Sequence, residues 1–185
     1  MSKYLPNYVF NTIYDIDYST LYEQGKNVIL FDLDNTIATY QELDPTIKHI
    51  EFNNMLRKYG FKIYIISNNH GPRIERFCKR FFVDGYLTNT KKPFTKRLNK
   101  YLEEQKITKE GAVFIGDQTL TDIVCSNKCD ICSILVKSID RNTEKWYTKI
   151  NRLRERLIIK HLTNKNILNA KEVLNIINKR SNNNE

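Results

Sequence analysis

Residues 28–34 combine an apolar run with two acids, and this segment limits the possible folds more than any other. The run Val-Ile-Leu-Phe occupies residues 28–31 and is followed by Asp32, Leu33 and Asp34. If the run is a buried strand, both acids can lie at the carboxyl edge of a sheet, where open α/β sheets bind ligands. Buried acids are costly unless they are paired or hold a cation. The segment therefore indicates either a reactive carboxylate pair or a turn with helix-capping residues.

The spacing of Asp32 and Asp34 suits two chemical tasks. A carboxylate can attack an electrophile and form a covalent intermediate, and a second carboxyl group nearby can move protons. We therefore interpret Asp32 as a candidate nucleophile and Asp34 as a candidate proton-handling group. The interpretation as a capped turn remains open from this segment alone.

Apolar runs and helical patterns alternate along the chain. The predicted strands are 28–31, 61–66, 86–89, 112–115 and 131–136, and the predicted helices are 44–59, 72–82, 93–105 and 120–128. Asp44 is the expected cap of the first helix, followed by Pro45, and Gly60 is its expected stop. The strands contain few polar residues, as expected of parallel strands buried on both faces. This alternation predicts a doubly wound α/β domain with a mostly parallel sheet.

The same pattern divides the chain into four segments. We expect an N-terminal flank over residues 1–25, a catalytic α/β domain over 26–140, a basic helical extension over 141–180, and a disordered tail over 181–185. No apolar run approaches the ~20 residues of a membrane span, and no secretory signal pattern is present, so we expect a cytoplasmic protein.

The net charge of +9 over 185 residues favours an anionic partner. A phosphorylated substrate, a nucleic acid and an anionic membrane surface all fit. Much of the charge comes from lysine in a chain rich in asparagine, so a compositional bias of the source genome explains it equally well. Charge alone does not select a partner.

Three cysteines, Cys125, Cys129 and Cys132, are closely spaced and could suggest a zinc site. No second pair of cysteines or histidines lies nearby in the sequence, as a zinc site of the usual spacing requires. We therefore favour reduced, partly buried thiols, as expected inside cells.

Polar residues follow three further predicted strands. Ser67 and Asn68 come after the second strand, where a hydroxyl and backbone N–H groups can bind a phosphoryl oxygen or cap the next helix. Lys92 follows the third strand, and the next residue, Pro93, is expected to start a helix. A cation there could neutralise phosphoryl charge, or it could belong to a solvated basic patch.

The fourth such strand ends in Gly116 and Asp117. Gly116 is expected to let the backbone turn sharply, so that Asp117 can face the same crevice as Asp32. Asp122 should lie about one turn into the next helix.

Together these residues resemble the four motifs of the haloacid dehalogenase-like (HAD) phosphohydrolase superfamily. The matching segments are Asp32-Leu33-Asp34-Asn35-Thr36, then Ser67, then Lys92, then Gly116-Asp117 with Asp122. Within subclass IIIA, the chain is most similar to the YqeG-like family, which is related to mitochondrial phosphatidylglycerophosphate phosphatases. The supporting segments are 4–6, 13–17, 32–36, 67–69, 92–93, 116–118, 121–122 and 148–152. His70 stands where that pattern has another small polar residue.

The resemblance implies a role for each of these residues. Asp32 would form an aspartyl-phosphate, and Asp34 would protonate the leaving oxygen and then activate water. Mg²⁺ would be held by the Asp32 carboxylate, the Asp34 backbone carbonyl and Asp117. The phosphoryl oxygens would be bound by Ser67, Asn68 and Lys92. Asp122 would be an outer-shell magnesium group or an orienter of Lys92.

The gaps between the motifs leave no room for a cap domain. Only 35 positions separate Asp32 from Ser67, and 25 separate Ser67 from Lys92. Both gaps are already filled by predicted elements, whereas a domain takes ~50 residues or more. We therefore expect an open site. It suits a phosphate on something large, and the family resemblance points to phosphatidylglycerophosphate.

Other functions stay open at this point. The same chemistry could act on a nucleic-acid end, a phosphoprotein or a small phosphoester. A protein that binds ribosomes or RNA without turnover is a further alternative. The intact acids Asp32, Asp34 and Asp117 and the intact Lys92 argue against this binding protein, and no aromatic-rich RNA-binding signature is evident either.

A predicted helix over residues 144–160 carries two stripes. The apolar stripe consists of Trp146, Ile150, Leu153 and Leu157, and the basic stripe consists of Lys145, Lys149, Arg152, Arg156 and Lys160. A basic amphipathic helix with a Trp near one end can bind an anionic membrane. The favoured alternative is a terminal helix whose apolar stripe packs on the sheet. A second short helix is expected over residues 170–178.

Overall fold

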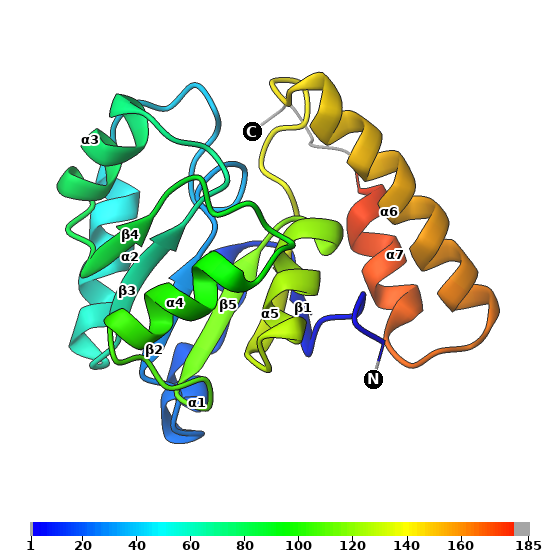
Figure 1. Cartoon of the computed structure of the whole chain (residues 1–185), viewed down its shortest axis with the longest axis horizontal. Helices are drawn as coiled ribbons and strands as arrows, with labels where there is room; N and C mark the ends of the chain where they lie inside the picture. Colours follow the sequence, from blue (N-terminus) through cyan, green and yellow to red (C-terminus); the bar gives the residue numbers. More distant parts are fainter. Residues whose placement is uncertain (1, 180–185) are drawn as a thin grey trace.

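The computed structural model describes residues 2–179, so the tail expected over 181–185 lies outside the described residues. At its centre is a six-stranded sheet in the order β1–β6–β5–β2–β3–β4, with every neighbouring pair parallel (Figure 1). The strands are β1 (Tyr8–Phe10), β2 (Val28–Phe31), β3 (Lys62–Ile66), β4 (Gly85–Leu87), β5 (Ala112–Gly116) and β6 (Cys132–Val136). The predicted α/β class with a parallel sheet is confirmed.

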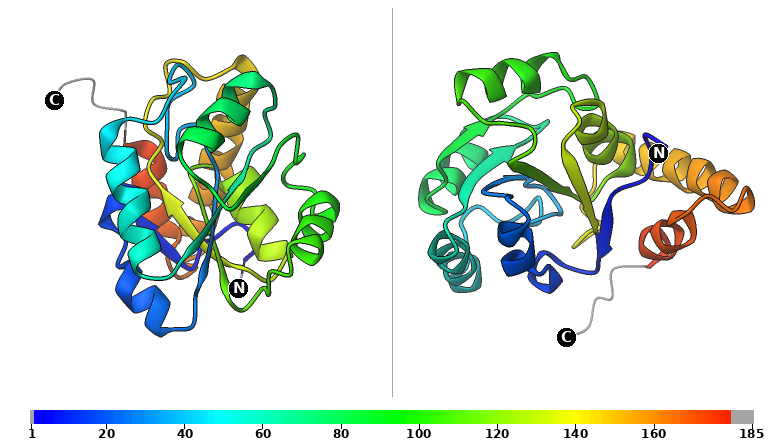
Figure 2. Two further views of the ribbon diagram at one scale, coloured as in Figure 1. Left: turned by 90° about the vertical axis from the view of Figure 1, so that its left-hand side faces the viewer. Right: turned by 90° about the horizontal axis from the view of Figure 1, so that it is seen from below.

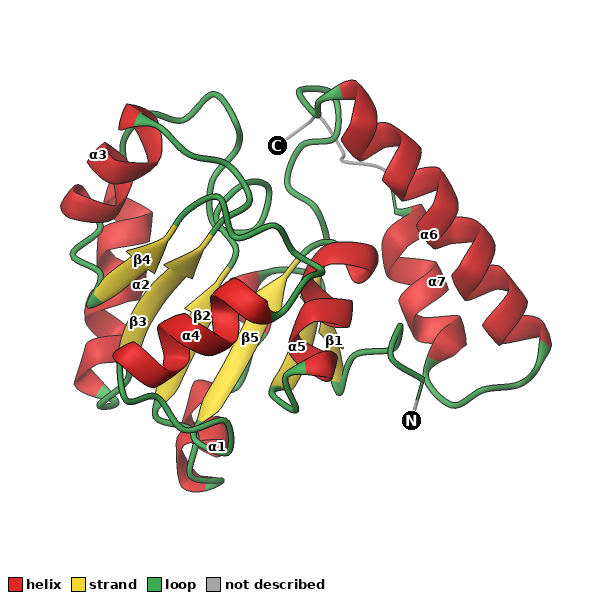
Figure 3. Cartoon of the chain, viewed as in Figure 1, coloured by secondary structure: helices red, strands yellow, loops and turns green. Residues whose placement is uncertain are grey.

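Helices cover both faces of this sheet (Figure 3). They are α1 (Tyr18–Glu23), α2 (Ile47–Lys58), α3 (Pro72–Arg80), α4 (Lys96–Glu104), α5 (Val124–Lys128), α6 (Trp146–Asn164) and α7 (Ala170–Asn178), with short helical turns η1 (Ile13–Asp15) and η2 (Thr119–Ile123). One core cluster joins the sheet to α1, α2 and α3, and a second joins its other face to α4 and α5. Only α2 lies between β2 and β3, and only α3 between β3 and β4.

Side chains alternate between these two cores along each strand. In β2, Ile29 and Phe31 belong to the first cluster, whereas Val28 and Leu30 belong to the second. Successive residues of a strand point to opposite faces, so a strand covered on both sides needs apolar residues at every position. This requirement explains why the central strands are uninterrupted apolar runs.

The starts of two helices differ from the sequence-based expectation. Helix α2 is capped by Thr46, whose hydroxyl accepts a hydrogen bond from the His49 N–H at 3.3 Å, while Asp44 pairs with arginines of α3. Pro93 does not start a helix, because residues 91–94 form a turn closed by the Phe94 N–H and the Lys91 carbonyl at 2.9 Å. Helix α4 begins only at Lys96.

The segment expected as an N-terminal flank takes part in the sheet and its core. Strand β1 pairs in parallel with β6, with Val9 opposite Leu135. Tyr18 of α1 is buried and donates its hydroxyl to the Ile13 carbonyl at 2.8 Å. The first 25 residues therefore add an edge strand and a covering helix to the α/β unit.

Helices α6 and α7 pack against each other beyond the β1 edge of the sheet (Figure 2). They form a third apolar cluster that includes Ile159 and Val173 and reaches Leu135 of β6. No helix within residues 2–179 combines the length and apolar character needed to cross a bilayer.

The apolar stripe of α6 points away from the protein. Trp146 is 73% exposed, Leu153 58% and Leu157 61%, and Ile150 is exposed as well. The buried side of the helix carries Thr148, Glu155 and Ile159 instead. The interpretation in which this stripe packs on the sheet is therefore wrong. Polar groups occupy the inward side because, as described below, they contact the carboxyl edge of the sheet.

The two sides of α6 should respond differently to truncation. Replacing Ile159, which is fully buried, with Ala should lower the free energy of unfolding by about 2–4 kcal/mol, as for other core deletions. The matched change Leu157→Ala, on the exposed side, should alter it by less than about 0.5 kcal/mol. Urea denaturation followed by circular dichroism measures both. Equal losses in the two variants would contradict the observed orientation of α6.

Candidate active site

The candidate site lies at the topological switch point of the sheet, where the strand order reverses. Strand β2 lies between β3 and β5, and the chain proceeds outward from β2 on one side and from β5 on the other. Loops that follow such neighbouring strands diverge and leave a crevice at their carboxyl ends. The structure brings the predicted residues together at this edge and buries most of them. The buried members are Asp32, Asp34, Ser67, Lys92, Asp117 and Asp122.

Lys92 is the central cation of the site. Its Nζ lies 2.7 Å from Asp32 Oδ1 and 2.7 Å from Asp122 Oδ1, and it donates to the Ile66 carbonyl at 2.7 Å. Burial alone would lower the pKa of Lys92, but the Asp122 and Asp32 carboxylates outweigh this effect and raise it. The side chain is therefore an ammonium ion that holds two acids in place.

Asp32 lies at the point where β2 ends. Burial raises the pKa of its carboxyl group, the Lys92 ammonium opposes that rise, and the other site carboxylates add to it. The Thr36 hydroxyl lies 3.4 Å from Asp32 Oδ2 and 3.4 Å from Asp117 Oδ1. One oxygen of Asp32 thus faces Lys92, and the other faces Thr36 and Asp117.

Asp34 points toward a different set of partners. Arg73 Nη1 lies 2.7 Å from Asp34 Oδ1, and the Asn69 amide donates to Asp34 Oδ2 at 2.7 Å. The remaining Arg73 donors bind the Thr39 and Glu42 carbonyls at 2.6 and 3.0 Å. Arg73 therefore positions the Asp34 carboxylate and the loop after β2 together. Sequence reasoning missed Arg73. The only indication in the sequence was its position in the first turn of α3, shortly after the 67–69 segment.

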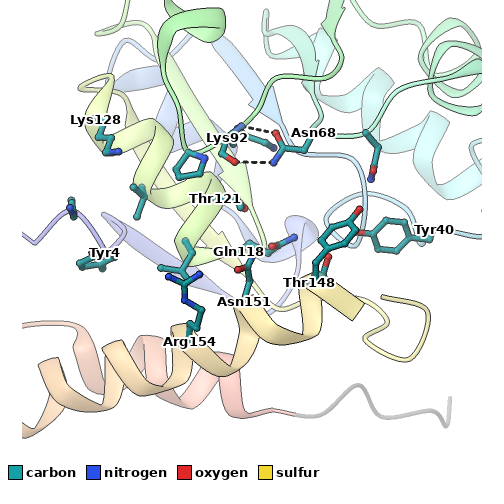
Figure 4. Close-up of a pocket in the computed structure, with 16 residues that line it drawn as sticks. Tyr4, Tyr40, Asn68, Lys92, Gln118, Thr121, Lys128, Thr148, Asn151 and Arg154 are labelled. Carbon is teal, nitrogen blue, oxygen red and sulfur yellow. Dashed lines mark hydrogen bonds between the residues drawn. The ribbon is translucent and has the colours of Figure 1, made fainter. Parts of the chain in front are cut away.

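Ser67 and Asn68 shape the loop after β3. The Ser67 hydroxyl accepts a hydrogen bond from the Asn69 N–H at 3.0 Å, which is the capping geometry expected of this turn. The Asn68 amide donates to the Lys92 carbonyl at 3.1 Å and accepts from the Lys92 N–H at 2.7 Å (Figure 4). Lys92 is therefore placed by Asn68 and two acids, not by a helix N-terminus. Phosphate binding by Ser67 and Asn68 stays a prediction.

Gly116 allows Asp122 to lie close to the backbone at the end of β5. A Cβ atom at this position would lie 2.5 Å from the Cβ of Asp122. The φ angle of Gly116 is not positive, so the sharp turn expected there does not explain why the residue is a glycine. Asp122 then reaches back to the loop, where its Oδ2 accepts from the Gln118 N–H at 3.0 Å.

Arg152 of α6 completes the site from the far end of the chain. Its guanidinium donates to the Asp117 carbonyl at 2.6 Å and pairs with the Asp117 carboxylate. It also lies 2.7 Å from Glu144 and 3.5 Å from Glu155. Because its side chain is only 10% exposed, Arg152 does not belong to a solvated basic stripe as predicted.

Glu155 fixes the other side of this contact. Its Oε1 accepts from the Leu120 N–H at 2.9 Å, which ties α6 to the start of η2. Burial raises the pKa of Glu155 to about 7, with Arg152 opposing the rise. The extension after residue 140 is therefore bonded directly to the loop that carries Asp117.

The acids at this edge fit a divalent cation. Oxygens of Asp32, Asp117 and Asp122 lie within 4.8 Å of one another among the described residues. Negative charge is also in excess. The carboxylates are Asp32, Asp34, Asp117, Asp122, Glu144 and Glu155, and the cations near them are Arg73, Lys92, Arg141 and Arg152. A hard cation bound by oxygens would offset this excess. The Asp34 carboxylate lies outside the cluster, so only its backbone carbonyl remains a candidate ligand.

Two other sequence features lie apart from this chemistry. Cys125 of α5 and Cys129, which follows this helix, are buried in the second core cluster, and Cys132 is in β6. Within residues 2–179, the residues grouped closely enough to hold a metal ion include no cysteine. His70 is exposed. Tyr40, which sequence reasoning missed, has its pKa raised by burial and by Asp32, Asp34 and Asp117.

Comparison with known proteins identifies relatives over most of the chain. A family model described as mitochondrial PGP phosphatase matches residues 1–139. The probable phosphatase YqeG of Bacillus subtilis (strain 168) is 30% identical over 162 residues, which cover 88% of this chain and 93% of that protein.

Solved structures share the fold at lower identity. An uncharacterized protein from Listeria monocytogenes serotype 4b has a TM-score of 0.51 and 22% identity, and the match covers 59% of this chain and 77% of that one. The cobalt-bound deoxy-D-mannose-octulosonate 8-phosphate phosphatase (YrbI) of Haemophilus influenzae has a TM-score of 0.50 and 12% identity, over 69% and 75% of the two chains.

Removal of the Arg152 charge should destabilise the protein strongly. Arg152→Gln leaves three buried carboxylates without their shared cation, and loss of one partner of a buried ion pair costs about 3–5 kcal/mol. Arg156→Gln removes an exposed arginine from the same helix and should change stability little. Urea denaturation measures both variants. A small effect of Arg152→Gln would show that α6 does not anchor the Asp117 loop.

Proposed function

Because this chain belongs to the mitochondrial PGP phosphatase family of HAD-type phosphatases, we propose that it is a Mg²⁺-dependent phosphomonoester hydrolase acting on phosphatidylglycerophosphate. The observation that carries the proposed chemistry is the buried arrangement of Asp32, Lys92 and Asp122 at the switch point of the sheet. An acid held there beside an ammonium ion suits attack on a phosphate ester.

In the first step, a carboxylate oxygen of Asp32 forms a bond to phosphorus while the bond from phosphorus to the leaving oxygen breaks. Asp34 in its protonated form donates its proton to the leaving oxygen, so the product is a free hydroxyl group. Lys92 stabilises negative charge on the phosphoryl group. The result is an aspartyl-phosphate on Asp32.

In the second step, water attacks the phosphorus of the aspartyl-phosphate and releases inorganic phosphate. Asp34 takes the proton of the attacking water, and this restores both carboxyl groups for the next cycle. Arg73 and Asn69, each 2.7 Å from Asp34, hold the Asp34 carboxyl group in position for this transfer. Over both steps, one water molecule is consumed for each ester bond broken.

Mg²⁺ would be held by the Asp32 and Asp117 carboxylates and the Asp34 carbonyl, with Asp122 beside it. When bound, it offsets the repulsion between the Asp32 carboxylate and the anionic phosphate. The charge excess at this edge supports a divalent ion, and oxygen ligands suit magnesium.

A lipid substrate is supported by the outer side of α6. Its exposed apolar stripe is flanked by exposed lysines and an arginine, and a helix of this kind can lie at an anionic membrane surface. The described elements between the motifs are single helices and strands, so they form no cap domain over the crevice. Peripheral contact with the membrane would bring a headgroup phosphate to Asp32.

The experiment that tests the reaction is a phosphate-release assay. Purified protein with Mg²⁺ should release phosphate from phosphatidylglycerophosphate, and Asp32→Asn should reduce the rate at least about 10³-fold because it removes the nucleophile. The side chains are nearly isosteric, so circular dichroism should show an unchanged fold. Wild-type turnover by Asp32→Asn would overturn the mechanism.

The substrate is tested in the same assay. Faster release from a 5′-phosphorylated oligonucleotide, a phosphopeptide or a small phosphoester than from the lipid would replace the lipid proposal with that substrate. Release from none of them would favour a protein that binds ribosomes or RNA without turnover.

Membrane contact should be measurable by sedimentation with vesicles. The protein should bind vesicles rich in phosphatidylglycerol and bind less at high salt, because part of the attraction is electrostatic. Replacement of both Leu153 and Leu157 by Gln should abolish this binding. Leu168→Gln, which changes another exposed leucine outside α6, is the control. Equal binding by all three proteins would exclude α6 as the membrane surface.

A further inference from the structure

A cavity of about 390 Å³ extends from the catalytic edge along α5 and α6 (Figure 4). Lys92 and Asn68 line it at the site described above. Its size lies within the range of small-molecule sites and exceeds what a single phosphate group needs. The substrate therefore has room to bind with atoms beyond its reacting phosphate.

The described lining of this cavity contains four cations and no carboxylate. The cations are Lys3, Lys92, Lys128 and Arg154. Lys92 is paired with two acids, but Lys3, Lys128 and Arg154 take part in no ion pair between described residues. Unpaired cations that share a concave wall attract a second anion.

These three cations are carried by segments with fixed positions. Lys128 ends α5, and Arg154 lies in the third turn of α6. The segment that carries Lys3 is tied to α5 because the Asn127 amide donates to the Lys3 and Leu5 carbonyls at 3.1 and 2.8 Å. Figure 4 shows Lys128 and Arg154 near Tyr4, away from Tyr40 at the opposite side of the cavity.

Neutral side chains also line the cavity. Gln118, Thr121 and Asn151 can bond hydroxyl groups, and Leu120 and Val124 add apolar surface. A short polyol that joins two phosphates matches this combination of cations and neutral polar groups. The exposed apolar stripe of α6 includes Leu153, the neighbour of Arg154 in the chain, and offers an exit for acyl chains.

We propose that Lys128 and Arg154, with Lys3, form a second anion subsite that binds the phosphodiester of a substrate whose phosphomonoester lies at Asp32. This inference rests on the proposed phosphatase function and makes it more specific. The enzyme would then select molecules with two phosphates joined by a short polyol, and the lipid headgroup is the source that the α6 stripe favours.

Two water-soluble substrates test the subsite without a membrane. Glycerol 3-phosphate has one phosphate, whereas glycerophosphoglycerol phosphate, the deacylated headgroup, has a phosphomonoester and a phosphodiester. Arg154→Gln and Lys128→Gln should each raise KM for the second compound about fivefold to tenfold, the loss expected for one charge-assisted hydrogen bond at a partly exposed site. KM for glycerol 3-phosphate should not change.

Arg97→Gln, which removes an exposed arginine from α4 outside the cavity, is the matched control and should affect neither substrate. Unchanged KM values, or equal increases for both substrates, would overturn the subsite. A lower KM for a 5′-phosphorylated dinucleotide than for the headgroup compound would overturn the assignment of the subsite to a lipid.

Calorimetric titration separates this inference from the proposed reaction. Asp32→Asn protein with Mg²⁺ should bind the headgroup compound about tenfold more tightly than glycerol 3-phosphate, and Arg154→Gln in that background should remove the preference. If the wild-type protein hydrolyses neither compound, the proposed function fails, yet this preference still decides the subsite. Equal binding of the two compounds would disprove the subsite even if hydrolysis is observed.

Discussion

The ion pairs of Lys92 hold the candidate site together. Its ammonium group lies 2.7 Å from both Asp32 and Asp122, so one buried cation links the end of β2 to the turn after β5. Without that cation, two carboxylates would be buried side by side, which is strongly unfavourable. The Asn68 amide fixes the Lys92 backbone from a third loop. The site is thus a set of loops joined by charges and hydrogen bonds above an apolar sheet.

Helix α6 extends this arrangement to the end of the chain. On its inner side, Arg152 binds Asp117 and Glu155 binds the backbone of η2, while its outer side is apolar and exposed. A surface helix usually shows the reverse pattern. The inner side is polar near Asp117 because the helix packs there over an acidic loop. Buried carboxylates in that loop are stabilised by a cation and not by apolar contacts. The same helix therefore holds Asp117, the proposed metal ligand, on one side and carries an exposed apolar surface, the proposed membrane contact, on the other.

The sequence predicted the parallel sheet and the cluster of acids because uninterrupted apolar runs ending in Asp32 and Asp117 leave few alternatives. It did not predict β1, since three residues at a sheet edge are too short to show a pattern. It also misjudged α6, because hydrophobic periodicity cannot show that Arg152 is buried against an acid distant in sequence. The partners of Asp34 were missed for the same reason, as Arg73 reaches it only in three dimensions.

The central claim is that Asp32 accepts a phosphoryl group, and a phosphate mimic reports on it without a natural substrate. Beryllofluoride binds a carboxylate as an analogue of an acyl-phosphate, so a crystal structure with Mg²⁺ and beryllofluoride would locate the acceptor. The account predicts beryllium bonded to a carboxylate oxygen of Asp32, with Lys92 beside its fluorines and the cation bound by Asp32 and Asp117. Beryllofluoride on another carboxylate, or on none at saturating Mg²⁺, would contradict it.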